Sequence, residues 1–278
     1  MAVAVTLPLF ADFVREIGGD HVEVFSLIPP GADPHTYELS AADIQRIGEA
    51  DFFFINGLGL DSRMEEVIEA NRNDDAKVIL FAANMSSPRA VDLGDPGITA
   101  EEAGDNPHLW LDPIPALSYA DLVADIFIIY DGINEGFYKT NLAARSGRVG
   151  QLDQEIRERI QDIPKEKRNL ITWHDSFSLF ARRYGLKLVD FVVSRPLDEP
   201  TSADIARVRQ AIAEHDVPAV FAEHGFAAAA LSDIAADSGV PVCTLYSDVL
   251  GETVQTYIDM MRFNVAEIRR CLGAAGDE

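Results

Sequence analysis

The segment Asn169–Val193, NLITWHDSFSLFARRYGLKLVDFVV, predicts the unit from which the fold is built. The apolar run Asn169–Trp173 predicts a strand, and Ser176–Tyr184 follows it with apolar residues at helical spacing. Gly185 is a natural helix stop, and Lys187–Val193 is a second strand candidate. A strand, a helix and a strand in this order are typical of a β/α unit with parallel strands.

The same alternation of short apolar runs and amphipathic segments recurs on both sides of this unit. One of the amphipathic segments is Leu9–Ile17, which Gly18-Gly19 ends. This pattern predicts an α/β fold with parallel sheets covered by helices. The further strand candidates are Ala2–Leu7, Val22–Leu27, Phe52–Ile55, Val78–Phe81, Ala219–Ala222 and Val242–Leu245.

Between the two halves of the chain, Glu135–Ile163 has few strand formers and many charged residues. Its apolar residues Leu152, Ile156 and Ile160 stand at helical spacing. We therefore expect one long helix that joins two lobes and ends before Pro164. The expected domains are an N-terminal β/α lobe, the connecting helix and a C-terminal β/α lobe, at residues 1–132, 133–164 and 165–278.

Two short segments repeat one local pattern, in which a hydroxyl residue stands three positions before an aspartate at a predicted helix start. Ser40 and Asp43 form the first pair, and Thr201 and Asp204 form the second. The spacing is that of a capping box, with Asp in place of the usual Glu or Gln. The repetition favours two related lobes.

The charge balance limits the partners of the protein. The 278 residues include 23 Lys and Arg against 46 Asp and Glu, a formal net charge of −23. Such a charge repels nucleic acid and anionic membrane surfaces and favours cations near the protein, although acidity that only maintains solubility is the alternative. No apolar stretch approaches the roughly 20 residues that span a bilayer, so an integral membrane protein is not expected.

The cysteine content limits the covalent chemistry. Cys243 and Cys271 are the two cysteines of the sequence, too few for a disulfide scaffold or a cysteine zinc site. Two alternatives remain open. The residues form one bridge between the last strand candidate and the terminal helix, or they are buried free thiols.

Four segments each place one metal-ligand type of side chain just past an apolar, strand-like run. These ligands are His35 in GADPHTYE, His108 in GDNPHLWLDP, His174 in ITWHDSFSLF and Asp248 in TLYSDVLGE. Ligands of doubly wound sheets lie at the carboxyl ends of strands, so loops from two sheets can meet at one cleft. Three neutral imidazoles and one carboxylate suit four-coordinate Zn²⁺. Mn²⁺ is the alternative, since it prefers more oxygen ligands, which a bidentate Asp248 would partly supply.

The other histidines have less favourable positions. His21 follows a Gly-Gly-Asp turn and His215 lies in a polar segment, so both are expected on the surface. His224 follows a strand candidate together with Glu223. It is interpreted as a residue at the rim of the site, with a fifth ligand or an outer-sphere partner as alternatives.

Carboxylates beside the predicted ligands form a second group of candidates. Metal-bound imidazoles usually donate their other N–H to such acceptors. One of them, the aspartate before Pro113, is equally a helix N-cap. The three carboxylates are Asp33, Asp112 and Asp175.

The sequence lacks the fingerprints of common catalytic sites. It contains no GxGxxG, GxxxxGK[ST], HExxH or GxSxG motif. A hydrolytic zinc enzyme keeps an open position for water, whereas a fourth protein ligand closes the site. We therefore favour binding and release of an ion over an enzyme. The rival hypotheses are a metal-dependent hydrolase or chelatase-like enzyme and an adhesin-like protein with a structural metal.

Seven motifs, spread over the chain, are specific in combination. They are IGGD at Ile17–Asp20, PPGADPHTYE at Pro29–Glu38, NGLGLD at Asn56–Asp61, PHLWLDP at Pro107–Pro113, WHDSF at Trp173–Phe177, and YSDVLGE with TYIDMMRFNV near the end. In these motifs the chain resembles the solute-binding proteins of zinc- and manganese-importing ABC transporters, the metal-specific cluster A-I. The resemblance extends over essentially the whole chain.

This resemblance implies two Rossmann-like lobes joined by a long helix, with a metal ion buried between them. It implies that His35, His108, His174 and Asp248 are the ligands. Members with histidine at the position of His174 are zinc-type or bind both metals, whereas many manganese-type members carry Glu there. Some zinc members have a long His-rich loop where this chain has the acidic segment 91–106, which we expect to be a surface loop.

The resemblance also implies where the protein acts and with what. The expected partners are a divalent metal ion and an ABC permease in the membrane, and the protein is expected to be a monomer that does not bind nucleic acid. It is expected to be extracytoplasmic, either free in the periplasm or lipid-anchored at the cell surface. The signal peptide, and any lipidated cysteine, would then precede these 278 residues.

Overall fold

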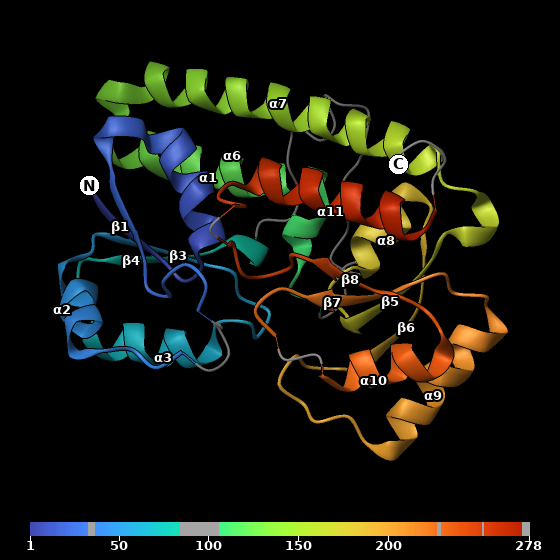
Figure 1. Ribbon diagram of the computed structural model, residues 1–278. Coiled ribbons are helices and arrows are strands. Elements are labelled where there is room, and N and C mark those ends of the chain that lie inside the picture. The colour runs from blue at the N-terminus through green and yellow to red at the C-terminus, as the bar shows by residue number, and fades with distance from the viewer. Residues whose placement is uncertain (33–36, 84–105, 227–228, 252, 274–278) are drawn as a thin grey trace. The chain divides into compact units, whose positions relative to one another are not determined.

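The protein divides by its internal contacts into two compact units. The computed structural model describes residues 1–32, 37–83, 106–226, 229–251 and 253–273 (Figure 1). Unit 1 comprises Met1–Gln151 together with the short segment Asp248–Glu252, and unit 2 comprises Leu152–Ser247 and Thr253–Glu278. The predicted domain limits at residues 132 and 164 stay predictions, because this division falls inside a helix.

Unit 1 contains a four-stranded parallel sheet with strand order β2-β1-β3-β4. Strand β3 reads FFFI and is buried along its whole length, as expected for an inner strand of a parallel sheet with both faces covered. The strands are β1 (Ala2–Val5), β2 (Glu23–Ser26), β3 (Phe52–Ile55) and β4 (Lys77–Leu80). The helical elements of this part are α1 (Pro8–Gly18), η1 (Gly19–His21), α2 (Ala41–Glu49), α3 (Ser62–Asn71), η2 (Phe81–Ala83), η3 (Leu109–Leu111), α6 (Pro113–Tyr130) and η4 (Gly132–Asn134).

Unit 2 contains a second four-stranded parallel sheet, with the corresponding order β6-β5-β7-β8. The two orders place the first strand of each unit beside the third, so the two sheets share one topology. The strands are β5 (Asn169–His174), β6 (Lys187–Val193), β7 (Val220–Glu223) and β8 (Val242–Leu245). The helices of this part are η5 (Lys165–Lys167), α8 (Ser178–Tyr184), α9 (Ser202–Glu214), α10 (Ala229–Ser238) and α11 (Tyr257–Cys271).

The predicted α/β fold with two parallel sheets is confirmed, and the repeated capping pattern falls at equivalent places. Ser40 caps α2 and Thr201 caps α9, and each is the helix after the second strand of its unit. In both helices the N-cap hydroxyl accepts from the backbone of the third residue, Asp43 or Asp204, whose carboxylate accepts from the N-cap backbone. The predicted strands agree with the observed ones to within two residues at either end.

Helix α6 corrects the expectation that no segment is long and apolar enough to cross a membrane. Within the described residues, its 18 residues have a mean hydropathy of 1.4, and 67% of this window is buried. The helix packs against α1, where Tyr119 contacts the rings of Phe10 and Phe13. Burial on most sides accounts for its apolar composition, as in the core helix of a soluble domain.

The predicted long helix is α7 (Glu135–Gln161), the green helix that runs along the top of Figure 1. In unit 1 the buried Arg145 of α7 forms ion pairs with Asp12 and Glu16 of α1, and its guanidinium lies 4.0 Å from the ring centroid of Phe13. In unit 2 the last third of the helix is held by Asp153, which pairs with Arg183 at 2.8 Å. Each part of α7 is therefore tied to its own unit.

The two cysteines form a disulfide. Cys243 of β8 is bonded to Cys271 at the end of α11, which resolves the two alternatives that the sequence left open. The bridge closes a segment with a sequence separation of 28 residues and joins the edge strand of the sheet to the last helix. Such a bond persists in oxidising compartments, in agreement with an extracytoplasmic protein.

Candidate metal centre

His108 lies in unit 1, directly before η3, and is 4% exposed. Its backbone N–H donates to Oδ1 of Asn106 at 2.9 Å, and its ring Nδ1 lies 2.9 Å from the same oxygen. An amide oxygen can only accept, so this contact assigns the ring proton to Nδ1. The other ring nitrogen, Nε2, is then a lone-pair donor suited to a metal ion.

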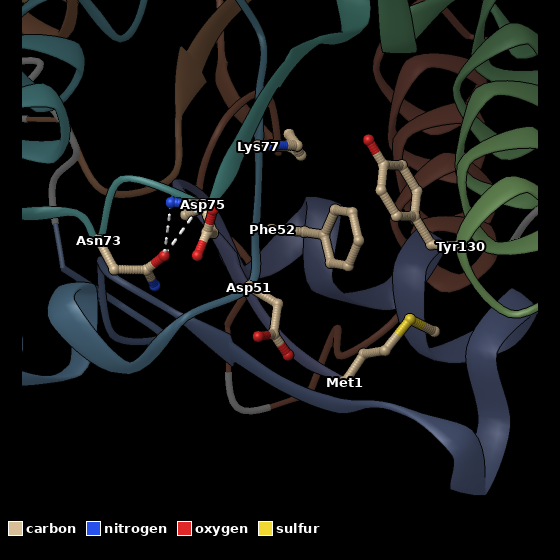
Figure 2. A pocket seen from close by; sticks show the side chains of 8 residues that line it. Met1, Asp51, Phe52, Asn73, Asp75, Lys77 and Tyr130 are labelled. Carbon is tan, nitrogen blue, oxygen red and sulfur yellow. Dashed lines mark hydrogen bonds between the residues drawn. The ribbon is translucent and has the colours of Figure 1, made fainter.

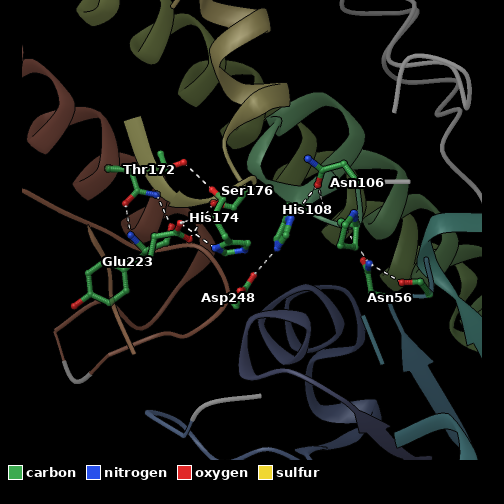
Figure 3. Close-up of polar contacts among 12 residues, drawn as sticks. Asn56, Asn106, His108, Thr172, His174, Ser176, Glu223 and Asp248 are labelled. Atoms are coloured by element: carbon green, nitrogen blue, oxygen red, sulfur yellow. Dashed lines mark hydrogen bonds and ion pairs between the residues drawn. The ribbon is translucent and has the colours of Figure 1, made fainter. Parts of the chain in front are cut away.

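Asp248 supplies a carboxylate next to that nitrogen. Its Oδ1 lies 3.4 Å from Nε2 of His108, and the residue is 1% exposed (Figure 3). Two ligand atoms at Zn–N and Zn–O distances of about 2.0–2.1 Å and a tetrahedral angle are about 3.4 Å apart. The pair therefore has the separation that two ligands of one zinc ion require. Although Asp248 follows strand β8 of unit 2, its contacts place it in unit 1.

His174 ends strand β5 of unit 2 and is 1% exposed. Its ring Nδ1 lies 2.9 Å from Oε1 of Glu223, and its backbone N–H donates to the same oxygen at 3.0 Å. The second oxygen of Glu223 accepts from the hydroxyl of Ser176 at 2.9 Å (Figure 3). A carboxylate on Nδ1 leaves Nε2 as the nitrogen that would ligate a metal.

The charge state of Glu223 follows from its surroundings. Burial alone would raise the pKa of this carboxyl, but the neighbouring His174 imidazole and the hydrogen bonds from His174 and Ser247 lower it below its usual value. Glu223 is therefore a buried carboxylate with its negative charge kept. Such a group fixes the tautomer of the imidazole and increases its basicity as a ligand.

The strand order explains why these residues meet. In unit 2, β5 lies between β6 and β7, so the chain turns to one side after β5 and to the other side after β6. Loops at the carboxyl ends of the strands separate at such a switch point, where ligands bind in open α/β sheets. His174 and Glu223 end the two strands at this point.

The structure does not describe all residues singled out in the sequence. His35 and Asp33 lie outside the described residues, as does the acidic segment up to residue 105. His35 as a ligand stays a prediction. The Asp112 side chain accepts from the backbone of Ile114 at 3.0 Å and caps α6, as the alternative interpretation proposed.

The remaining histidines do not join these contacts. His21 is exposed and makes an edge-to-face contact with Phe137, and His215 is partly exposed at the end of α9. His224 is half-buried against the ring of Tyr246, and burial lowers its pKa. Asn106 was missed in the sequence analysis, although an amide two residues before a predicted ligand is a local signal for this type of contact.

A cavity of about 310 Å³ lies at the amino ends of the strands in unit 1 (Figure 2). It is lined by residues that precede or begin strands, including Met1, Asp51 and Lys77, and by Tyr130 at the end of α6. His108 instead follows the carboxyl ends of the strands. The cavity is therefore separate from the candidate metal centre.

A family model described as "Zinc-uptake complex component A periplasmic" matches residues 3–271. The chain belongs to this family. The match covers nearly all described residues and includes His108, His174 and Asp248. The family consists of substrate-binding proteins of metal ABC transporters, and these are not enzymes. The prediction of a binding protein without catalytic activity is thereby confirmed.

Relatives of this zinc-uptake family member include proteins named for manganese. The manganese-binding lipoprotein MntA of Halalkalibacterium halodurans is 27% identical over 270 residues, which cover 95% of this chain and 86% of the relative. The manganese ABC transporter substrate-binding lipoprotein PsaA of Streptococcus pneumoniae is 28% identical, with coverage of 96% and 87%. These relatives are lipoproteins of metal transporters, which act outside the cytoplasm.

Solved structures show the same fold. The periplasmic zinc binding protein TroA of Treponema pallidum is 27% identical, has a TM-score of 0.83 and covers 98% of both chains. A Cd-bound periplasmic metal binding protein of Candidatus Liberibacter asiaticus has 22% identity and a TM-score of 0.83, with coverage of 98% of this chain and 99% of that one. The named relatives thus bind manganese, zinc or cadmium, and the family alone does not select the metal of this chain.

Proposed function

We propose that this protein captures Zn²⁺ outside the cytoplasm and delivers it to an ABC permease. The observation that carries the proposal is the buried pair of His108 Nε2 and Asp248 Oδ1, which lie 3.4 Å apart. A buried carboxylate and an imidazole nitrogen at this separation match two ligands of one tetrahedral ion. Zn²⁺ is cargo in this proposal and is bound reversibly.

The complete ligand set in this proposal is His35, His108, His174 and Asp248. Unit 1 supplies the pair just described, and His174 of unit 2 is supported as a ligand by the carboxylate of Glu223 on its Nδ1. Both imidazoles would then use Nε2 toward the ion. His35 enters the set through its place in the PPGADPHTYE motif.

Zinc is favoured over manganese by the donor atoms. Three imidazole nitrogens and one carboxylate are typical of zinc, whereas manganese prefers sites with more oxygen. Mn²⁺ is the second candidate, since MntA and PsaA are both named for manganese. We propose that the protein acts as a monomer, free in the periplasm or lipid-anchored at the cell surface.

Calorimetric titration with Zn²⁺ tests the ligand assignment. His108→Ala and Asp248→Ala are each expected to weaken zinc binding by at least 100-fold, because each removes one of four ligands. The exposed His21→Ala is the matched control and should bind as the unchanged protein does. Zinc affinity that is unaltered in both ligand variants would contradict the proposal.

Competition between the two metals tests the choice of ion. When the metal-free protein is mixed with equimolar Zn²⁺ and Mn²⁺, it should bind zinc in preference to manganese. Elemental analysis of the protein from its native compartment should also find zinc. Preferential retention of Mn²⁺ in both measurements would support the second candidate. Delivery to the permease is tested by zinc uptake, which should be lower in cells that lack the gene.

A further inference from the structure

A buried amide connects the sheet of unit 1 to the segment that carries His108. Asn56 directly follows strand β3 and is fully buried. Its Nδ2 donates to the carbonyl oxygen of Pro107 at 2.9 Å, although 51 residues separate the two in sequence. On its other side, Oδ1 accepts from the hydroxyl of Tyr119 at 2.6 Å. Both ends of the Asn56 amide are therefore hydrogen-bonded.

The backbone that carries Asn56 is itself held in place. The Oδ2 atom of the buried Asp61 accepts from the backbone N–H of Asn56 at 2.6 Å and of Gly57 at 2.9 Å. Between these residues the chain makes a tight turn in which Gly57 and Leu58 have φ of 83° and 52°. A carboxylate that accepts two backbone N–H groups within such a turn fixes its conformation.

Tyr119 is fixed from the side of helix α6. Its ring stacks on Phe81 with a centroid distance of 4.4 Å and an interplanar angle of 2°, and the residue is fully buried. This packing fixes the ring, and with it the position of the hydroxyl that donates to Asn56. The amide of Asn56 is therefore held between Tyr119 of helix α6 and Pro107 in the segment before His108.

The two contacts of the 106–108 segment act at different points. Asn106 binds the ring and the backbone N–H of His108, which sets the rotation of the ring relative to its own segment. Asn56 binds the carbonyl of Pro107, which sets the segment relative to the sheet. A buried polar group destabilises the folded protein unless it is hydrogen-bonded. The buried amide of Asn56 therefore favours the conformation in which its partners, Pro107 and Tyr119, are in place.

We propose that Asn56 is a positioning residue for metal capture, and that Tyr119 and Asp61 support it. Through Pro107, it holds the imidazole of His108 at the distance from Asp248 at which both can ligate one ion. Metal ligands need placement within about 0.5 Å, and the outer hydrogen bonds that provide it affect affinity. This inference rests on the proposed function of His108 as a ligand.

Asn56→Asp is the direct test, since it keeps the shape of the side chain but replaces the Nδ2 donor by an oxygen that faces the carbonyl of Pro107. Zinc affinity should fall 10- to 100-fold, as for other outer hydrogen bonds of metal sites. Tyr119→Phe is the milder variant, which keeps the ring and removes one donor. It should weaken zinc binding by about 3- to 10-fold.

Tyr138→Phe is the matched control for the milder variant. It also removes a buried tyrosine hydroxyl from a 2.6 Å hydrogen bond in unit 1, but that hydroxyl binds Asp131, far in sequence from the metal ligands. Thermal unfolding of all variants reports stability. The visible spectrum of bound Co²⁺ reports ligand geometry, which general loss of stability does not change.

The inference is supported if Asn56→Asp and Tyr119→Phe weaken zinc binding and alter the Co²⁺ spectrum while Tyr138→Phe does neither. If Asn56→Asp does not fold, the comparison of zinc affinity and Co²⁺ spectrum between Tyr119→Phe and Tyr138→Phe decides. Binding within twofold of the unchanged protein in both test variants would overturn the inference, and so would equal losses in Tyr119→Phe and Tyr138→Phe. Failure of the proposed function is distinct, because His108→Ala would then bind zinc normally.

Discussion

The imidazole Nδ1 of His174 lies 2.9 Å from Oε1 of Glu223, across two neighbouring strands of the same sheet. The two residues are 49 positions apart in sequence, and each is the last residue of its strand. The carboxylate receives both the backbone N–H and the ring contact of His174, so it sets the position of the whole residue. A carboxylate on Nδ1 leaves Nε2 as the nitrogen of His174 that would ligate a metal ion.

Replacement of Glu223 by Gln should weaken zinc binding by about 10- to 100-fold. The substitution keeps an oxygen that can accept from the imidazole but removes the negative charge that would make His174 a better ligand in the proposed site. Isothermal titration with Zn²⁺ measures the effect. Glu214→Gln, on the exposed surface of α9, is the control and should bind as before. Unchanged affinity in Glu223→Gln would show that the carboxylate does not assist the ligand.

Asp61 should make the stability of the protein depend on pH. Burial raises its pKa from 3.8 to about 6, against the lowering effect of hydrogen bonds from Thr6, Gly57 and Asn56. Because the folded protein then binds the proton more tightly than the unfolded chain, stability from this group is present at low pH and is lost as pH rises toward and through 6.

The size of this effect can be measured with Asp61→Asn, which keeps one acceptor oxygen for the turn. The free energy of unfolding of the variant relative to the unchanged protein should rise by about 2 kcal/mol between pH 4.5 and pH 7. Urea unfolding at a series of pH values provides the measurement. A difference that stays constant with pH would show that Asp61 is not titrating in this range.

Asp43→Asn is a useful control with the opposite sign. Partial burial raises the pKa of Asp43, but hydrogen bonds from Ser40 and Tyr37 and the charge of Arg46 lower it overall. A lowered folded pKa means stability that is present at neutral pH and is lost in acid. The variant should therefore lose stability relative to the unchanged protein as pH rises, where Asp61→Asn gains it.

Removal of the disulfide by Cys243→Ser together with Cys271→Ser should lower the free energy of unfolding by about 3–4 kcal/mol. This follows from the loop-closure entropy of the 28-residue separation between the cysteines. Chemical unfolding of both proteins under non-reducing conditions measures the difference. Addition of a reductant should bring the unchanged protein to the stability of the double variant, and a reductant without effect would contradict the prediction.

Arg145 and Arg148 offer a matched pair on helix α7. Both pair with Glu16 of α1, but the side chain of Arg145 is 0% exposed and that of Arg148 is 47% exposed. Arg145→Ala should destabilise the protein by about 2–5 kcal/mol, because it empties the buried site where the guanidinium packs on Phe13 and removes the ion pairs to Asp12 and Glu16. Arg148→Ala should cost about 1 kcal/mol or less. Equal effects in thermal or urea unfolding would refute the assigned difference.

Local sequence signals predicted most of the fold because they depend on near neighbours. Gly185, with a φ of 71°, ends α8, and the hydroxyls of Ser40 and Thr201 cap α2 and α9 as expected. The apolar run FFFI formed the buried strand at its predicted limits. Helix α6 departs from the expectation that no apolar stretch approaches the length of a membrane span, because Asp121 and Asp125 interrupt its apolar run although the mean hydropathy over its 18 residues is 1.4.

The sequence by itself determined the order of strands and helices and the residue types able to bind a metal at their ends, since propensity, caps and periodicity are properties of short segments. Only the tertiary structure decided which of these residues meet. Packing placed Asp248 in unit 1 beside His108, brought Glu223 to His174 through the adjacency of β5 and β7, and joined Asn56 to Pro107. Such pairings depend on strand order and side-chain packing between remote segments, which no local pattern specifies.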